Sequence, residues 1–154
     1  MTDILLYRRF SRSKWDDAEK STCWYTNVRW LADLQPGDYL WLVTSGANLR
    51  REERQAGFLV ALWAVAGVAE NPGDDPAHPR DDFRFRIVAD DSGSVTLDDP
   101  VLIDDILRPE GRDRMEPIGR FLSAPKRLDE RQVRRLRAAA GPELALKWLT
   151  GNRR

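Results

Sequence analysis

The chain has 154 residues, of which 42% are hydrophobic, and its 25 basic side chains balance its 25 acidic ones. This length suits one domain, residues 1–154, with a sizeable core, and no apolar run is long enough to span a bilayer. The first apolar residues precede the first basic ones, the reverse of the order in a secretory signal. Because Cys23 is the only cysteine, the sequence predicts a cytoplasmic protein without internal disulfides.

Charge is unevenly distributed along the chain. Between Asn71 and Asp105, ten Asp oppose three Arg, so this stretch carries a net charge of −7 and the remainder +7. Most cations of the remainder are Arg, whose planar guanidinium suits phosphate and ring stacking better than the Lys ammonium does. A neutral chain is not a strong non-specific binder of polyanions, but this segregation allows a local basic face.

The N-terminal part begins with an expected strand. Residues 4–10 alternate imperfectly, which places Leu6, Arg8 and Phe10 on one side. Residues 11–20 are polar and carry Trp15 alone. Such a tryptophan more often fastens a loop to the core than binds a ligand.

The stretch from Ser21 to Ser45 holds three of the six tryptophans. Apolar residues at helical spacing predict a helix over 27–34, and Gln35-Pro36-Gly37 ends it because the residue before a proline avoids helical geometry. The strand predicted over 38–44 is apolar on both faces, which is typical of a strand covered on both sides in a small closed barrel.

The middle of the chain predicts further strands. Residues 46–55 form an Arg-containing loop, and the apolar run 57–70 suits one bent strand or two strands. Residues 71–82 are loop, 83–88 alternate as a half-buried strand, 90–93 read as a turn, and 95–97 as a short strand.

The C-terminal part predicts mainly helices. A short helix is expected over 101–107, a return to the sheet over 118–124, and a helix that Asp129 and Gln132 cap and that ends at Gly141. A last helix is expected over 142–151. The sum is an α+β domain of about five or six strands flanked by short helices.

Catalytic motifs are missing from the sequence. It contains no GxSxG, no phosphate-binding loop and no HExxH. His78 is the only histidine, and loop carboxylates beside it make a weak metal pattern. We therefore expect neither an enzyme nor a cofactor or metal.

Aromatic and amide side chains are what remains. A flipped base is held by stacking on aromatic faces while amides and hydroxyls bond its edge, and each stack contributes about 1–3 kcal/mol. Trp24, Tyr25, Asn27, Thr44 and Ser45 are suitable residue types. The alternative is that Asn27 caps its helix and Trp24 packs beneath it as core.

A resemblance to a known family bears on this choice. Trp24 and Asn27-Val28-Arg29 precede the predicted helix, the turn at Gly37-Asp38 and a strand that ends in Thr44-Ser45. WAVAGVAE (63–70), the strand at 83–88, the passage from 95–97 into 103–107, and 120–125 before the helix at Asp129 follow in order. This order resembles the EVE domain, which belongs to the PUA-like superfamily with YTH and ASCH domains. The family's Tyr-His before the serine is Val43-Thr44 here.

The resemblance implies a PUA-like pseudo-barrel with a pocket for a modified base of DNA or RNA. Trp24 would be a cage wall, with Trp15 or Trp41 as a second stacking ring. Tyr25, Asn27, Thr44 and Ser45 complete the expected base-binding set. From the basic part of the chain, rather than from the resemblance, we expect phosphate to be held by Arg8, Arg9, Arg12, Arg50, Arg51 and Arg54.

A second hypothesis keeps the tryptophans as ordinary core. The domain would then bind a protein partner or a small ligand, which the zero net charge favours. Neither hypothesis involves a membrane, and the sequence leaves the oligomeric state open.

Overall fold

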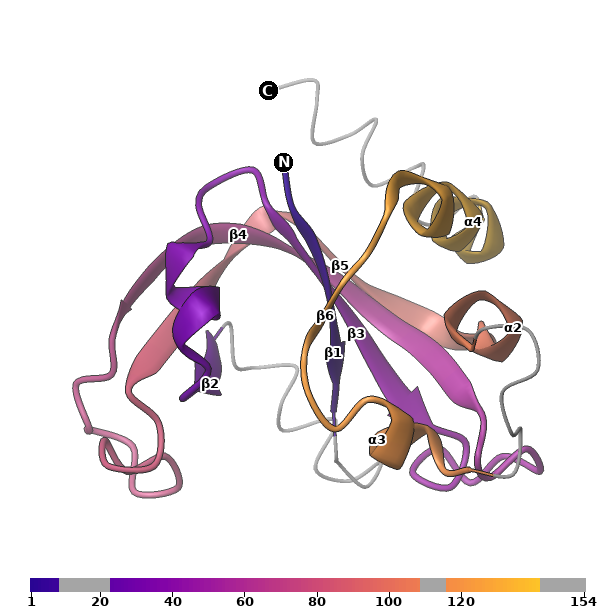
Figure 1. Ribbon diagram of the computed structural model, residues 1–154, viewed down its shortest axis with the longest axis horizontal. Coiled ribbons are helices and arrows are strands. Elements are labelled where there is room, and N and C mark those ends of the chain that lie inside the picture. Colours follow the sequence, from indigo (N-terminus) through magenta and orange to yellow (C-terminus); the bar gives the residue numbers. More distant parts are fainter. Residues whose placement is uncertain (9–22, 109–115, 142–154) are drawn as a thin grey trace.

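The computed structural model describes residues 1–8, 23–108 and 116–141, which form a mixed six-stranded sheet curled into a half-barrel (Figure 1). The strand order is β2-β5-β4-β3-β1-β6. β1 pairs with β3 in parallel, and the other pairings are antiparallel. The strands are β1 (Asp3–Tyr7), β2 (Cys23–Thr26), β3 (Tyr39–Ser45), β4 (Gly57–Glu70), β5 (Phe85–Leu102) and β6 (Lys126–Arg127).

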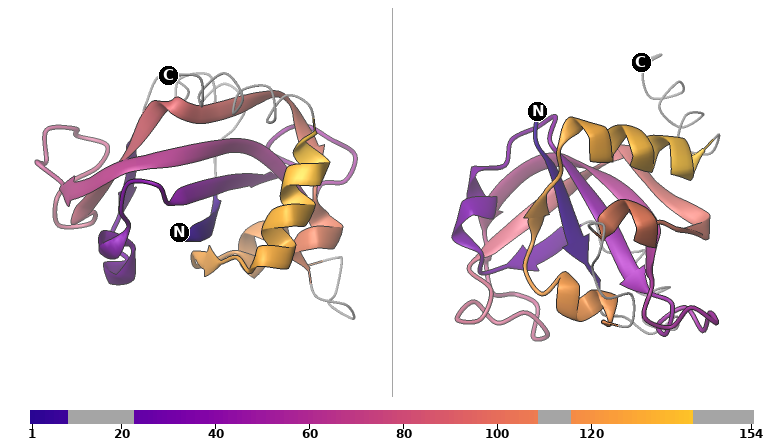
Figure 2. Two further views of the ribbon diagram at one scale, coloured as in Figure 1. Left: turned by 90° about the horizontal axis from the view of Figure 1, so that it is seen from above. Right: turned by 45° about the vertical axis from the view of Figure 1, so that its right-hand side comes forward.

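Short helices cover both faces of this sheet. The 3₁₀ helix η1 lies apart from α2, α3 and α4, which gather toward the other end of the sheet (Figure 2). The helices are η1 (Arg29–Asp33), α2 (Asp104–Leu107), α3 (Ile118–Phe121) and α4 (Glu130–Ala140). Among the described residues, no helix has both the length and the apolar character that crossing a membrane requires. The prediction of an α+β domain with about five or six strands and short helices is confirmed.

The central strand β3 contributes to two hydrophobic clusters. Trp41 and Val43 pack with side chains of α2, α3 and α4, whereas Leu40 and Leu42 pack with Leu31 of η1. Successive strand residues point to opposite faces, so an apolar sequence on both faces requires cover on both. The prediction of a strand covered on both sides is confirmed.

The two longest strands are irregular. β4 is one bent strand of 14 residues, as one of the two predictions had it, and its register with β5 shifts three times. The turn predicted over 90–93 is wrong, because this segment is a bulged part of β5. There Ser94 Oγ donates to the Asp90 carbonyl at 2.6 Å and accepts from the Ala64 amide at 3.0 Å.

Other predicted elements differ at their ends. Residues 118–121 form helix α3 rather than a strand, because Ile118, Phe121 and Leu122 recur at a spacing of three or four and share one helix face. The helix predicted over 27–34 is only η1, and the preceding residues 23–26 form β2. The capping box of Asp129 and Gln132 on α4 is confirmed. The predicted loop 11–20 and helix 142–151 lie outside the described residues.

Candidate functional site

A small pocket opens where the two ends of the curled sheet approach each other. β2 and β6 stand at opposite ends of the strand order. One pocket of about 160 Å³ is nevertheless lined by β1, by β2 and by the segment that leads into β6. We call it the seam pocket, and its lining residues are Leu6, Tyr7, Trp24, Thr26, Val28, Leu122, Ser123, Ala124 and Pro125.

The short pairing of β6 explains this opening. β6 pairs with β1 only at Ile4 and Leu5. Residues 122–125, which connect α3 to β6, do not extend that pairing to the rest of β1. A space is therefore left between this connection, the end of β1 and the strand β2 from the far end of the strand order.

Trp24 forms one wall of the seam pocket. It is half-buried, and β2 holds it opposite Ile87 of β5. The guanidinium carbon of Arg8 lies 5.9 Å from the centroid of the Trp24 ring and 5.0 Å from that of Trp63. Cation–π attraction of this kind restrains a ring, so Arg8 helps to hold the pocket wall in place.

A chain of hydrogen bonds joins the end of β1, which lines the pocket, to the end of β3 and the turn that follows it. The Asn48 side-chain amide donates to the Thr44 hydroxyl at 2.9 Å and to the Tyr7 hydroxyl at 3.4 Å. The Thr44 hydroxyl donates in turn to the Arg8 carbonyl at 2.7 Å. The sequence did not indicate a role for Asn48 or Tyr7. The one available signal for Asn48 was its position in the turn after β3, and Tyr7 had none.

Thr44 and Ser45 do not line the seam pocket. They are 1% and 7% exposed, and Ser45 Oγ accepts from the backbone N–H of Asn48 at 3.1 Å. These hydroxyls therefore order the turn after β3 in this structure, rather than presenting themselves to a ligand.

The other predicted base-binding residues also lie elsewhere. Tyr25 stacks on His78 with ring centroids 4.1 Å apart, while Asn27 is exposed and does not line the pocket. Trp41 has no exposed surface, and its indole nitrogen donates to Asp3 at 2.9 Å, so it offers no face for stacking. Of the described candidates, only Trp24 reaches the pocket; Trp15 lies outside the described residues.

The predicted phosphate-binding arginines do not form one surface. Arg8 is 4% exposed and sits between tryptophans, which leaves it no access to a surface phosphate. Arg51 pairs with Asp99 at 2.7 Å. Arg50 and Arg54 are exposed but do not line the seam pocket. Arg9 and Arg12 lie outside the described residues.

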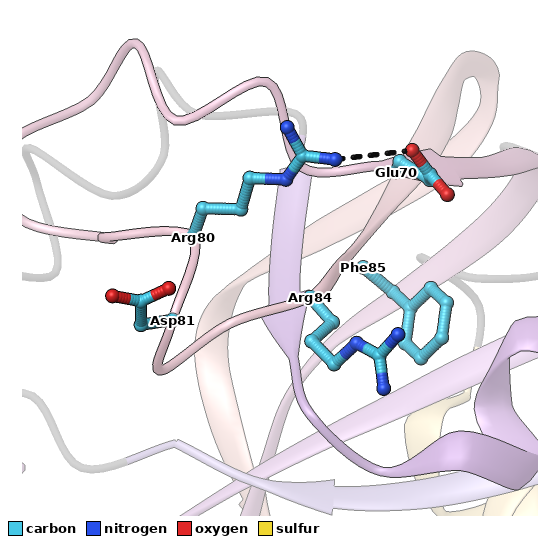
Figure 3. A pocket seen from close by; sticks show the side chains of 5 residues that line it. All are labelled: Glu70, Arg80, Asp81, Arg84 and Phe85. Carbon is cyan, nitrogen blue, oxygen red and sulfur yellow. Dashed lines mark hydrogen bonds and ion pairs between the residues drawn. The ribbon is translucent and has the colours of Figure 1, made fainter.

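Two other hollows have less suitable linings for a nucleic acid. Figure 3 shows one of about 240 Å³ beside the loop from β4 to β5, where Arg80 meets Glu70 at 3.3 Å and Arg84 lies near the ring of Phe85. Its lining combines acidic and basic side chains, so it offers no uniformly positive surface to a nucleic acid. Its ion pair is exposed, and exposed ion pairs contribute little to stability. The other, of about 470 Å³, includes Glu53, Asp104 and Asp105, whose carboxylates repel phosphate.

Comparisons with known proteins assign no family. No family model matches the chain, and no curated protein matches it.

Proposed function

We propose that this chain is a non-enzymatic PUA-like domain, similar to EVE domains, that binds one flipped-out, modified base of DNA or RNA in the seam pocket. The observation that carries the proposal is the half-buried Trp24 ring in the wall of that pocket. The pocket volume of about 160 Å³ is below the roughly 300–1,000 Å³ of pockets for drug-sized ligands. It suits a single flat ring.

Two hydroxyls supply edge contacts for such a ring. Thr26 is only 6% exposed but, unlike Thr44 and Ser45, it lines the pocket. Its oxygen accepts from the Val28 amide at 3.0 Å, so the hydroxyl proton would donate to a ligand that enters the pocket. Ser123 is exposed on the opposite lining segment. Stacking on Trp24 would contribute about 1–3 kcal/mol, so the hydroxyls would decide which base edge is preferred.

Replacing Trp24 tests the proposal. Fluorescence anisotropy would measure the binding of labelled oligonucleotides that carry a methylated cytosine, a methylated adenine or no modification. Trp24→Ala should weaken binding of the preferred oligonucleotide by about tenfold or more, because it removes a stack of about 1–3 kcal/mol. Trp24→Phe keeps a stacking face and should retain most of the affinity.

Circular dichroism serves as the folding control for both variants. If Trp24→Ala binds as tightly as the native chain, or if it unfolds, Trp24 is not a stacking wall.

A protein partner or a small ligand is the second candidate, which the zero net charge favours. Phosphate contacts make affinity fall steeply with salt, whereas a protein interface responds much less. A salt titration of the binding reaction separates the two functions.

A further inference from the structure

Three exposed basic residues lie close in the sequence to residues that line the seam pocket: Arg29, Lys126 and Arg127. Arg29 follows the pocket residue Val28, and the other two follow the pocket residue Pro125. We call these three residues the basic rim. They come from both sides of the seam, because Arg29 begins η1 beyond β2 whereas Lys126 and Arg127 form β6.

Aromatic rings fix the positions of two rim side chains. The guanidinium carbon of Arg127 lies 5.0 Å from the centroid of the Trp30 ring, and Lys126 Nζ lies 5.0 Å from that of Phe121. Trp30 belongs to η1, so the first contact joins the two sides of the seam. Long basic side chains held on aromatic faces lose less freedom when they bind an anion than unrestrained ones do.

The segment of sequence that contains β6 is positively charged overall. From Glu116 to Gly141 the sequence has seven basic and three acidic residues, a net charge of +4. Within the described part of the chain, no carboxylate forms an ion pair with the basic rim, whereas Arg51 and Arg80 each pair with an acidic residue. The rim charges therefore stay available to an external anion.

We propose that the basic rim binds the phosphates on either side of the base that enters the seam pocket. The proposal rests on the proposed function, since a base in the pocket brings its flanking phosphates to the rim. Arg29 and Arg127 have the planar fork that suits phosphate oxygens, and Lys126 adds a point charge. The loop 46–55, where the sequence suggested phosphate contacts, is not part of this surface.

A protective role for β6 is the competing explanation. β6 is a two-residue strand at the edge of the sheet, and charged residues on short edge strands prevent pairing with other chains. The two explanations predict different effects of removing the charges.

The test is the salt dependence of binding by Lys126→Gln/Arg127→Gln. Its ligands are the oligonucleotide that the native chain binds most tightly, its unmodified counterpart, and a duplex of each. Losing two phosphate contacts should reduce the slope of log affinity against log salt by about 1.4 for single strands or 1.8 for duplexes. The ratio of affinities for modified and unmodified strands should not change. Arg50→Gln/Arg54→Gln removes the same charge and should leave the slope unchanged.

Other outcomes overturn the proposal. An unchanged slope for Lys126→Gln/Arg127→Gln shows that these residues do not bind phosphate, and dimers in size-exclusion chromatography would then show that they guard the edge. A reduced slope for the Arg50/Arg54 variant moves the phosphate contacts to loop 46–55. If the native chain has no base preference but the rim variant lowers the slope, the seam pocket does not bind a base, although the basic rim still binds phosphate. If the native chain binds no oligonucleotide, both fail.

Discussion

Trp24 and Trp41 illustrate how one residue type takes two roles in two strands of the same sheet. Trp24 lies on the strand β2 at one end of the sheet, where the curl leaves a gap beside it. Trp41 lies on β3, which has a strand on each side and cover on both faces, and it has no exposed surface. Position in the sheet, rather than the residue or its sequence neighbours, decides which tryptophan can meet a ligand.

Replacing Trp41 by Phe should reduce stability without changing ligand binding. Its indole nitrogen donates to the buried Asp3 carboxylate at 2.9 Å. Removing that donor leaves a buried acceptor without its bond, at a cost of about 1–3 kcal/mol, and the smaller ring adds a cavity. Urea unfolding measures the loss of stability. If Trp41→Phe instead weakened oligonucleotide binding at native stability, Trp41 would be part of the binding site.

At the scale of elements, the loop from β4 to β5 is held against β2. Asn71 is fully buried, and its amide donates to the carbonyls of His78 and Phe83 at 3.0 and 2.8 Å. The His78 ring stacks on Tyr25 and meets Asp75 at 2.8 Å. The lone histidine, which suggested a weak metal pattern, thus has structural partners.

The carboxyl of Asp75 should titrate at unusually low pH. The His78 side chain first, and then the Ala77 amide, hold the pKa of Asp75 below its ordinary value of 3.8. A lowered pKa in the folded state contributes stability that is present above pH 3.8 and is lost as the pH falls through the folded pKa. His78→Ala should raise the pKa of Asp75 part of the way to 3.8, because the Ala77 bond persists.

Carbon-13 NMR titration of the carboxyl measures this change. Tyr25→Leu removes the ring stack but not the hydrogen bond, and it should leave the pKa low. An equal rise in both variants would show that loop docking, rather than the His78 bond, sets the pKa.

Elements with strong local signals could be predicted from the sequence, and those set by distant pairing could not. The capping box of α4 and the apolar β3 were predicted because their patterns are complete within a few residues. β2 has only four residues and forms through its pairing with β5. The bulge at 90–94 was mistaken for a turn, because turns and bulges both use Asp, Ser and Gly.

At the scale of the whole molecule, the candidate site is assembled from the two ends of the sheet. The sequence draws attention to Trp24 because aromatic residues cluster before the first helix, but the same cluster fits an ordinary core equally well. Residues 122–125 carry no chemical signal of a pocket, and they reach it only because the sheet curls. The helical layer also reaches this seam, since Gly119 of α3 lies against the ring of Tyr7.

Gly119→Ala should therefore reduce both stability and binding. Helix propensity alone favours Ala by about 1 kcal/mol. A methyl group at this position would instead lie 2.7 Å from Tyr7 Cε1 and 2.8 Å from Cζ, and such overpacking costs about 1–3 kcal/mol. Because Tyr7 lines the seam pocket and accepts from Asn48, its displacement should also weaken oligonucleotide binding.

Gly67→Ala is the matched control, because nothing lies within 4 Å of its added methyl group. Thermal unfolding should show a native or slightly raised midpoint for Gly67→Ala and a lowered one for Gly119→Ala. A more stable Gly119→Ala variant with native binding would mean that helix propensity outweighs the contact with Tyr7. In that case α3 would not hold Tyr7 in place, and the wall of the seam pocket on β1 would be set by the Asn48 bond and by the pairing of β1 with β3.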